Sequence, residues 1–208
     1  MKTILTVILF AFLAFAFADY PTGLTECKHP IAMANFNPKK FLHGKWFVTN
    51  AKHGSNSTVC REYKAKQNGR NQELIGDGYY SFSGQTIYFT VRCKRLPNKK
   101  QQKQQPLKFT CTQKNPNVKS MKILFQLEVT VLHTDYANYA IMYRCVKFPP
   151  ELQSLIEDNT LVLQRKANKP VDEDSCIHKI LKQQDLLLES FKSRKGVKCL
   201  KPPKKKKN

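Results

Sequence analysis

The chain has 208 residues, a length typical of one domain. It carries 36 Lys and Arg residues against 15 Asp and Glu residues, which gives a formal net charge of +21 at pH 7. Hydrophobic residues make up 41% of the chain, so it can bury a sizeable core and is not a disordered polycation. The 11 Pro and 8 Gly residues are scattered, which excludes a collagen-like or low-complexity protein.

The N-terminus has the parts of a secretory signal peptide. Lys2 supplies a positive charge, residues 4–17 are mostly apolar, and Ala16-Phe17-Ala18 is a small-residue cleavage pattern. The alternative is an uncleaved membrane anchor, but a span needs about 20 apolar residues. We therefore expect residues 1–18 to be a signal peptide and the mature protein to be secreted, with its cysteines in an oxidising space.

Residues 19–40 read as irregular, and from Lys45 to Phe148 the chain reads as successive strands. Residues 121–132 alternate most cleanly, with an apolar side chain at every second position from Ile123 to Val131. Short strands at regular spacing predict an all-β barrel or sandwich. Eight strands are expected, at residues 46–49, 58–66, 73–82, 85–94, 107–114, 121–132, 136–148 and 160–165.

The pattern changes after Pro170. Acids at positions 172–174 favour a helix N-terminus, and Ile177, Ile180 and Leu181 form an apolar stripe at helical spacing. We expect a C-terminal helix that completes a single domain over residues 19–200. The lysine-rich tail, residues 201–208, is predicted to be disordered.

Three motifs together resemble those of the lipocalins: Gly44-Lys45-Trp46 at the first strand, Thr134-Asp135-Tyr136 followed by Tyr139 and Tyr143, and Arg165 at the end of the last strand. The resemblance implies an eight-stranded antiparallel barrel with a C-terminal α-helix. In such a barrel Trp46 plugs the closed end and Arg165 lies over its ring as a cation–π contact. Eight strands leave an interior for about one small ligand; the alternative is an interior filled by side chains.

Longer segments are similar to the salivary lipocalins of blood-feeding triatomine bugs, the triabin and pallidipin group. The similar segments are residues 34–36, 44–46, 138–145 and 191–199. This resemblance implies interference with host haemostasis. The two routes it suggests are scavenging of small platelet agonists in the barrel and binding of clotting or contact-phase proteins.

Seven cysteines cannot all pair with one another. The family resemblance implies two bridges: Cys27–Cys145 and Cys60–Cys199. Cys93 and Cys111 lie on consecutive expected strands and could face each other, which makes a third bridge plausible. Cys176 is then left over. We expect it to be a buried, inert thiol, the alternative being a covalent dimer or a mixed disulfide.

The sequence offers little for catalysis, metals or haem. The spacings H-x-x-x-H, C-x-x-C and H-E-x-x-H are absent, as is a nucleophile elbow, so we expect no enzyme and no metal site. The related haem carriers use a histidine on the third strand, and that position falls at or beside Tyr79 here, so no cofactor is expected. Asn56-Ser57-Thr58 is a glycosylation sequon.

The charge is unevenly distributed along the chain. No acid lies between Asp77 and Glu128, and many cations cluster at residues 96–106 and in the tail at 204–207. A charge run is usually a solvated face, but this excess favours attraction to polyanions, anionic membrane surfaces or anionic agonists. Specific nucleic-acid binding is not expected of a secreted lipocalin. The cations between the two acids are Arg92, Lys94, Arg95, Lys99, Lys100, Lys103, Lys108, Lys114, Lys119 and Lys122.

The hypothesis that follows is a secreted, monomeric anti-haemostatic lipocalin. It would inhibit platelet aggregation by binding a small hydrophobic or anionic agonist, an eicosanoid such as thromboxane or ADP, in the barrel. The alternative is an inhibitor of coagulation or contact activation that acts through its basic outer surface; a third is a carrier without inhibitory activity. From strand phase, which a one-residue slip would invert, the predicted ligand-binding residues are Val48, Val59, Arg61, Tyr63, Tyr79, Phe125, Leu127, Tyr139 and Tyr143.

Overall fold

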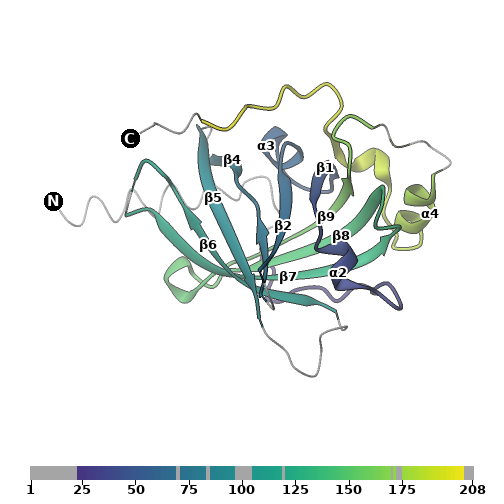
Figure 1. The fold of residues 1–208 in the computed structure, drawn as a ribbon, viewed down its shortest axis with the longest axis horizontal. Helices are drawn as coiled ribbons and strands as arrows, with labels where there is room; N and C mark the ends of the chain where they lie inside the picture. The colour runs from purple at the N-terminus through teal and green to yellow at the C-terminus, as the bar shows by residue number, and fades with distance from the viewer. Residues whose placement is uncertain are drawn as a thin grey trace.

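The computed structural model describes residues 23–68, 71–82, 85–96, 105–118, 120–169, 171 and 175–203. Within these residues the strands form a closed antiparallel barrel, as predicted (Figure 1). The strands are β1 (Lys45–Ala51), β2 (Glu62–Asn68), β3 (Asn71–Ile75), β4 (Gly78–Phe82), β5 (Gln85–Arg95), β6 (Leu107–Lys114), β7 (Lys122–Thr134), β8 (Tyr139–Lys147), β9 (Ile156–Gln164) and β10 (Lys192–Ser193).

Eight strand positions make the ring, because β3 and β4 share one position and the short β10 adds to the edge of β1. β1 closes the ring by pairing with β9. β3 and β4 pair with different halves of β5. The single strand predicted over residues 73–82 is therefore wrong. Gly76 and Asp77 interrupt it, and the Asp77 carboxylate accepts a hydrogen bond from the Val91 N–H at 2.8 Å.

The helical segments are short: α2 (Pro38–Phe41), α3 (Asn56–Val59), η1 (Pro150–Leu152), α4 (Cys176–Lys182) and η2 (Leu188–Ser190). The predicted C-terminal helix is confirmed as α4, although Pro170 and residues 172–174 lie outside the described part of the chain. α3 replaces the start of the strand predicted over residues 58–66. Ser and Asn side chains favour caps and turns over strands, which accounts for this difference.

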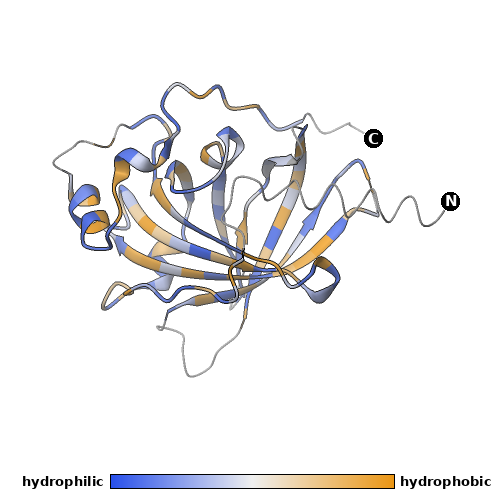
Figure 2. Cartoon of the chain, turned by 180° about the vertical axis from the view of Figure 1, so that it is seen from behind, coloured by the Kyte–Doolittle hydropathy of each residue, from blue (hydrophilic) through white to orange (hydrophobic). Residues whose placement is uncertain are grey.

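The main core fills the barrel. On β7, Leu127, Val129 and Val131 are buried in this core, and Phe125 packs against it. This is the face that the sequence predicted. Figure 2 shows the alternation as orange and blue bands along the strands.

A second core lies outside the barrel, between β8 and the C-terminal part of the chain. Ile141 and Tyr143 of β8 belong to it, together with Ile177 and Leu181 of α4. Since the barrel core covers the other face of β8, residues 140–146 are all buried. The burial of β8 therefore does not distinguish its inner face from its outer face.

The closed end of the barrel is built around Trp46, as the motif predicted. Gly44 adopts a φ of 65°, a left-handed conformation that favours glycine. The Arg165 guanidinium carbon lies 3.4 Å from the centroid of the Trp46 ring. Arg165 also donates to the carbonyls of His43 at 2.6 Å, Lys45 at 2.8 Å and Tyr136 at 3.1 Å. One side chain thus fastens the starts of β1 and β8 to the end of β9.

Three disulfides connect the termini and the strands, with the predicted pairing: Cys27–Cys145, Cys60–Cys199 and Cys93–Cys111. The first joins the N-terminal arm to β8, and the second joins the segment after α3 to the C-terminal segment. The third links β5 to β6, where the two residues are direct cross-strand partners. Three bridges are consistent with a secreted protein.

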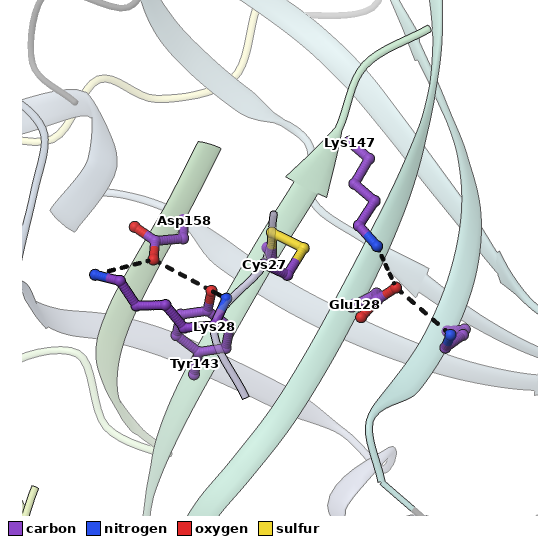
Figure 3. Close-up of a disulfide and its surroundings, with 8 residues drawn as sticks. Cys27, Lys28, Glu128, Tyr143, Lys147 and Asp158 are labelled. Atoms are coloured by element: carbon purple, nitrogen blue, oxygen red, sulfur yellow. Dashed lines mark hydrogen bonds and ion pairs between the residues drawn. A yellow bond between two sulfur atoms is a disulfide. The ribbon is translucent and has the colours of Figure 1, made fainter. Parts of the chain in front are cut away.

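Beside Cys27, a polar cluster holds the N-terminal arm to the outer side of β8 (Figure 3). The Lys28 N–H donates to the Tyr143 hydroxyl at 2.8 Å, and this hydroxyl donates to Asp158 Oδ2 at 3.2 Å. The Lys28 ammonium lies 3.6 Å from the same carboxylate oxygen. Burial, reinforced by the charge of Asp158, raises the pKa of Tyr143, so its hydroxyl remains a donor.

The C-terminal segment, residues 192–203, runs from α4 across one end of the barrel towards β4 (Figure 1, yellow). Arg194 fastens its start, since it donates to the Val59 carbonyl at 2.9 Å. Tyr79 fastens its far part by donating to the Lys201 carbonyl at 3.2 Å. Among the described residues, no helix has the length and apolar character needed to cross a bilayer. Residues 1–18 and 204–208 lie outside the description.

Replacing Arg165 by Lys tests the closed end. The ammonium of Lys cannot reproduce a planar fork that contacts three carbonyls and an indole ring. We expect the free energy of unfolding to fall by about 2–3 kcal/mol, measured by urea denaturation. Lys166→Ala, at the exposed neighbouring position, should change it by less than about 0.5 kcal/mol. Equal stability of the two variants would contradict this account of Arg165.

A second prediction concerns Glu128, which accepts a hydrogen bond from Lys147 at 2.9 Å (Figure 3). The Lys108 ammonium lies 3.6 Å from the same carboxylate oxygen. Burial of the carboxyl opposes its ionisation, but the two ammonium groups outweigh burial and lower the pKa of Glu128. A lowered pKa stabilises the fold above the unfolded-state value of about 4.3, and this contribution disappears as the pH falls through the folded-state value.

Glu128→Gln should therefore be less stable than the wild type at about pH 6, and the difference should shrink as the pH falls through the folded-state pKa of Glu128. Urea unfolding at a series of pH values measures this. A difference that stays constant with pH would show that the carboxylate charge is not responsible.

Candidate functional site

A cavity of about 100 Å³ lies inside the barrel, next to α3 and the neighbouring strand ends. Four of the predicted ligand-binding residues line it: Arg61, Tyr63, Phe125 and Leu127. Val48 and Val59 are fully buried in the barrel core and do not line this cavity. Pockets for drug-sized ligands are usually about 300–1,000 Å³, so side chains fill most of this interior.

The cavity wall is charged. Arg144 and Glu157 form an ion pair whose side chains are only 6% and 13% exposed. The Arg61 guanidinium lies 4.2 Å from the centroid of the Tyr80 ring. Burial raises the pKa of Tyr80 to about 12, against the opposing effect of Arg61, so Tyr80 stays neutral at physiological pH. Two guanidinium groups and one carboxylate give the cavity a net positive charge, which suits a small anion.

The sequence prediction missed Tyr80, Arg144 and Glu157 as cavity residues. Arg144 could have been found, because it is the one charge within the otherwise apolar run from Tyr139 to Val146 of the strand predicted over residues 136–148. Glu157 lies before the strand predicted over residues 160–165, because β9 begins earlier, at Ile156. Its pairing with Arg144 depends on the cross-strand register and is not visible in the sequence.

Three predicted ligand-binding residues lie elsewhere. Tyr139 and Tyr143 were predicted to face inward, but they pack with the outer core beneath α4. The prediction had the wrong phase because both faces of β8 are buried. Tyr143 instead anchors the N-terminal arm, and the Tyr139 hydroxyl lies 2.9 Å from His133 Nδ1. Tyr79 lies outside the barrel, in a separate groove.

This outer groove has a volume of about 790 Å³. It lies between the C-terminal segment and the outer side of the sheet from β2 to β5. Its residues include four lysines, Lys45, Lys64, Lys192 and Lys198, and two aromatic residues, Tyr79 and Tyr88. The two tyrosine rings are in edge contact, with their centroids 5.2 Å apart.

Three serine hydroxyls stand between the cavity and the outer groove, and all three residues line both. Ser55 Oγ lies 3.0 Å from Ser57 Oγ and 3.2 Å from Ser81 Oγ, and Ser57 and Ser81 are 3.3 Å apart. Ser57 belongs to α3 and Ser81 to β4. Within the described chain, β4 pairs with β5 and with no other strand. The serine cluster lies beside the unpaired edge of β4 and separates the cavity from the outer groove.

Other candidate residues have simpler surroundings. Asn56 of the sequon is exposed at the start of α3, where it also lines the outer groove. Cys176 is a free and exposed thiol, so the expectation of a buried thiol is wrong; it interacts with the Tyr139 hydroxyl, which lies beneath α4. Within the described residues, no group of three His, Cys, Asp or Glu side chains could hold a metal ion.

Comparison with known proteins gives a family match. The family model described as Triabin matches residues 17–176. Triafestin-1 of Triatoma infestans is 66% identical over 209 residues, an alignment that covers 100% of this chain and 98% of that protein.

Solved structures give the same fold. The tryptamine complex of the amine-binding protein of Rhodnius prolixus has a TM-score of 0.62 at 16% identity, covering 82% of this chain and 86% of that one. A leukotriene C4 complex of LTBP1 has a TM-score of 0.56 at 24% identity, covering 81% of this chain and 90% of that one. These neighbours have the lipocalin barrel and hold small ligands.

Tyr143→Phe tests whether Tyr143 is an anchor. Removing the hydroxyl leaves the Lys28 N–H and a buried Asp158 oxygen each with one partner fewer, so we expect a loss of about 1–3 kcal/mol in the free energy of unfolding. Tyr79→Phe, at a half-buried residue on the outer groove, should lose less than about 1 kcal/mol. Urea denaturation of both variants provides the measurement, and an unchanged stability of Tyr143→Phe would refute the anchoring role.

Proposed function

This chain belongs to the triabin family, and we propose that it is a secreted salivary anti-haemostatic protein that inhibits coagulation or contact activation through its basic outer face. The observation that carries this proposal is the contrast between a small interior cavity and a large excess of exposed cations. The partners would be the anionic surfaces on which clotting proteins assemble, or the clotting proteins themselves.

The interior argues against a bulky agonist as the main ligand. The cavity measures about 100 Å³, and a buried ion pair occupies part of its wall. A lipid such as thromboxane, with a long apolar chain, needs a pocket nearer to about 300 Å³. It would also have to displace the desolvated charges of Arg144 and Glu157, which are costly to separate.

The exterior supports the proposal. The basic outer face consists of exposed lysines on β2, β5, β6 and β7 and on the C-terminal segment: Lys64, Lys66, Lys94, Lys108, Lys114, Lys122, Lys192, Lys195, Lys198 and Lys201. Nearby acids are largely engaged, since Glu62, Asp77 and Glu128 all form ion pairs. The field of this face therefore attracts anionic partners over about one Debye length, roughly 8–10 Å.

A second candidate is binding of a small anionic agonist in the barrel, with inhibition of platelet aggregation. The observation that favours it is the pair of guanidinium groups, Arg61 and Arg144, in the cavity wall. Structural neighbours of the same fold hold leukotriene C4 and tryptamine. ADP or the carboxylate of an eicosanoid would be the anionic group, and the cavity would have to widen to admit the rest of either molecule.

Two variants separate these functions. The surface variant changes Lys64, Lys66, Lys94, Lys114, Lys192 and Lys198 to Gln. The cavity variant, Ile123→Trp, places a larger side chain at a half-buried residue that lines the cavity. We expect the wild type and the cavity variant to delay surface-triggered clotting of plasma equally, and the surface variant to lose about tenfold in potency because its long-range attraction is weakened.

The same proteins are then tested against platelets stimulated by ADP or a thromboxane analogue. If the cavity variant alone loses inhibition of aggregation, while clotting is unaffected by any of the proteins, the barrel scavenger replaces the basic-face inhibitor. Unchanged thermal unfolding of both variants serves as the control for folding.

A further inference from the structure

We propose that the outer groove is a binding site for a sulfated glycan chain. This inference rests on the proposed function, because it assigns one place and one ligand class to the basic outer face.

The shape of the groove suits a chain and not a surface. Its volume of about 790 Å³ falls within the usual range for ligand sites of about 300–1,000 Å³. Leu200 and Pro202 of the C-terminal segment form one wall, and the outer side of the sheet forms the other. A flat membrane cannot enter between two walls, whereas an extended oligosaccharide can.

The wall made by the C-terminal segment is fastened at several points. The Cys60–Cys199 disulfide ties it to the segment that follows α3. The Tyr79 hydroxyl donates to the Lys201 carbonyl at 3.2 Å, and β10 pairs with β1 at the other end of the segment. The groove therefore exists before a ligand arrives, which lowers the cost of binding.

The cations of the groove are available to a ligand. Lys64, Lys192 and Lys198 are exposed and form no ion pair within the described residues. The two acids of the groove are neutralised: Glu62 lies 3.0 Å from Lys45, and Asp77 pairs with Arg92. Three unmatched ammonium groups along one groove match the spaced charges of a polyanion.

The apolar floor distinguishes a sulfated glycan from polyphosphate. Tyr79 and Tyr88 meet edge to face, and Ile75 lines the same groove. Tyrosine rings pack against the C–H faces of sugar rings, and polyphosphate has no such faces. Thr86 and Ser57 add hydroxyls that can exchange hydrogen bonds with sugar hydroxyls.

The test measures binding of a heparin-derived hexasaccharide to the full mature chain by calorimetry. The groove variant changes Lys64, Lys192 and Lys198 to Gln. The control variant changes Lys166, Lys169 and Lys179, exposed lysines outside the groove, to Gln. Both remove the same charge, so the long-range field falls equally. We expect the groove variant to lose at least about tenfold in affinity and the control variant to lose less than about threefold.

Salt dependence and an aromatic variant sharpen the result. The slope of log affinity against log salt should fall in the groove variant by about 2–3, one for each ammonium group removed from the site, by analogy with nucleic acids. Tyr88→Ala should weaken binding about fivefold with an unchanged slope, because it removes an apolar contact and no charge.

Each contrary outcome overturns a different statement. Equal losses in the groove and control variants would show a diffuse surface field without a groove site. Tighter binding of polyphosphate or single-stranded DNA than of the hexasaccharide would overturn the glycan assignment alone. Binding of none of these polyanions by the wild type would remove the proposed action on anionic surfaces together with the groove.

Discussion

Pairing of β1 with β9 closes the barrel, and both candidate sites lie where the ring of hydrogen bonds is incomplete. β1 pairs with β2 only through residues 45–47, and β10 takes over at residues 50 and 51. β4 pairs with β5 but not with β2. α3 and the C-terminal segment fill the resulting opening. A short helix and an extended segment cannot cover this opening as tightly as a paired strand would. The space that they leave forms the cavity and the outer groove, with the serine cluster between them.

The cations inside this barrel have different surroundings from those outside. Inside, Arg144 pairs with Glu157 and Arg61 lies over the Tyr80 ring, since a charge without a partner would be too costly to bury. Outside, cations outnumber acids, and Lys64, Lys192 and Lys198 stay solvated. Solvated cations cost little until a polyanion neutralises them, at which point counterions are released and binding is favoured. The free energy of binding is therefore expected to be more favourable for an anionic partner on the surface than for a ligand that must displace the buried ion pair.

The sequence predicts those parts of the fold that depend on one-sided burial or on the family motifs. The phase of β7 was predicted because apolar and polar residues alternate along its sequence, and solvent and core alternate over residues 122–126. The Trp46–Arg165 contact followed from the lipocalin motifs. The phase of β8 was wrong because α4 buries its outer face, which erases the alternation. Part of the cavity wall was also missed. The neighbours of Tyr80 depend on the strand break at Gly76, and the neighbours of Glu157 depend on the register of β9. Both features arise from tertiary contacts between residues far apart in the chain.

The short helix α3 connects the two sites physically. Its Ser57, together with Ser55 just before it, forms the partition that meets Ser81 of β4. The same segment leads into Cys60, whose disulfide fixes the C-terminal wall of the groove. The position of α3 therefore sets both the volume of the cavity and the width of the groove. Because the partition consists of hydroxyl contacts and not of strand pairing, side chains alone separate the interior from the basic exterior at this point of the barrel.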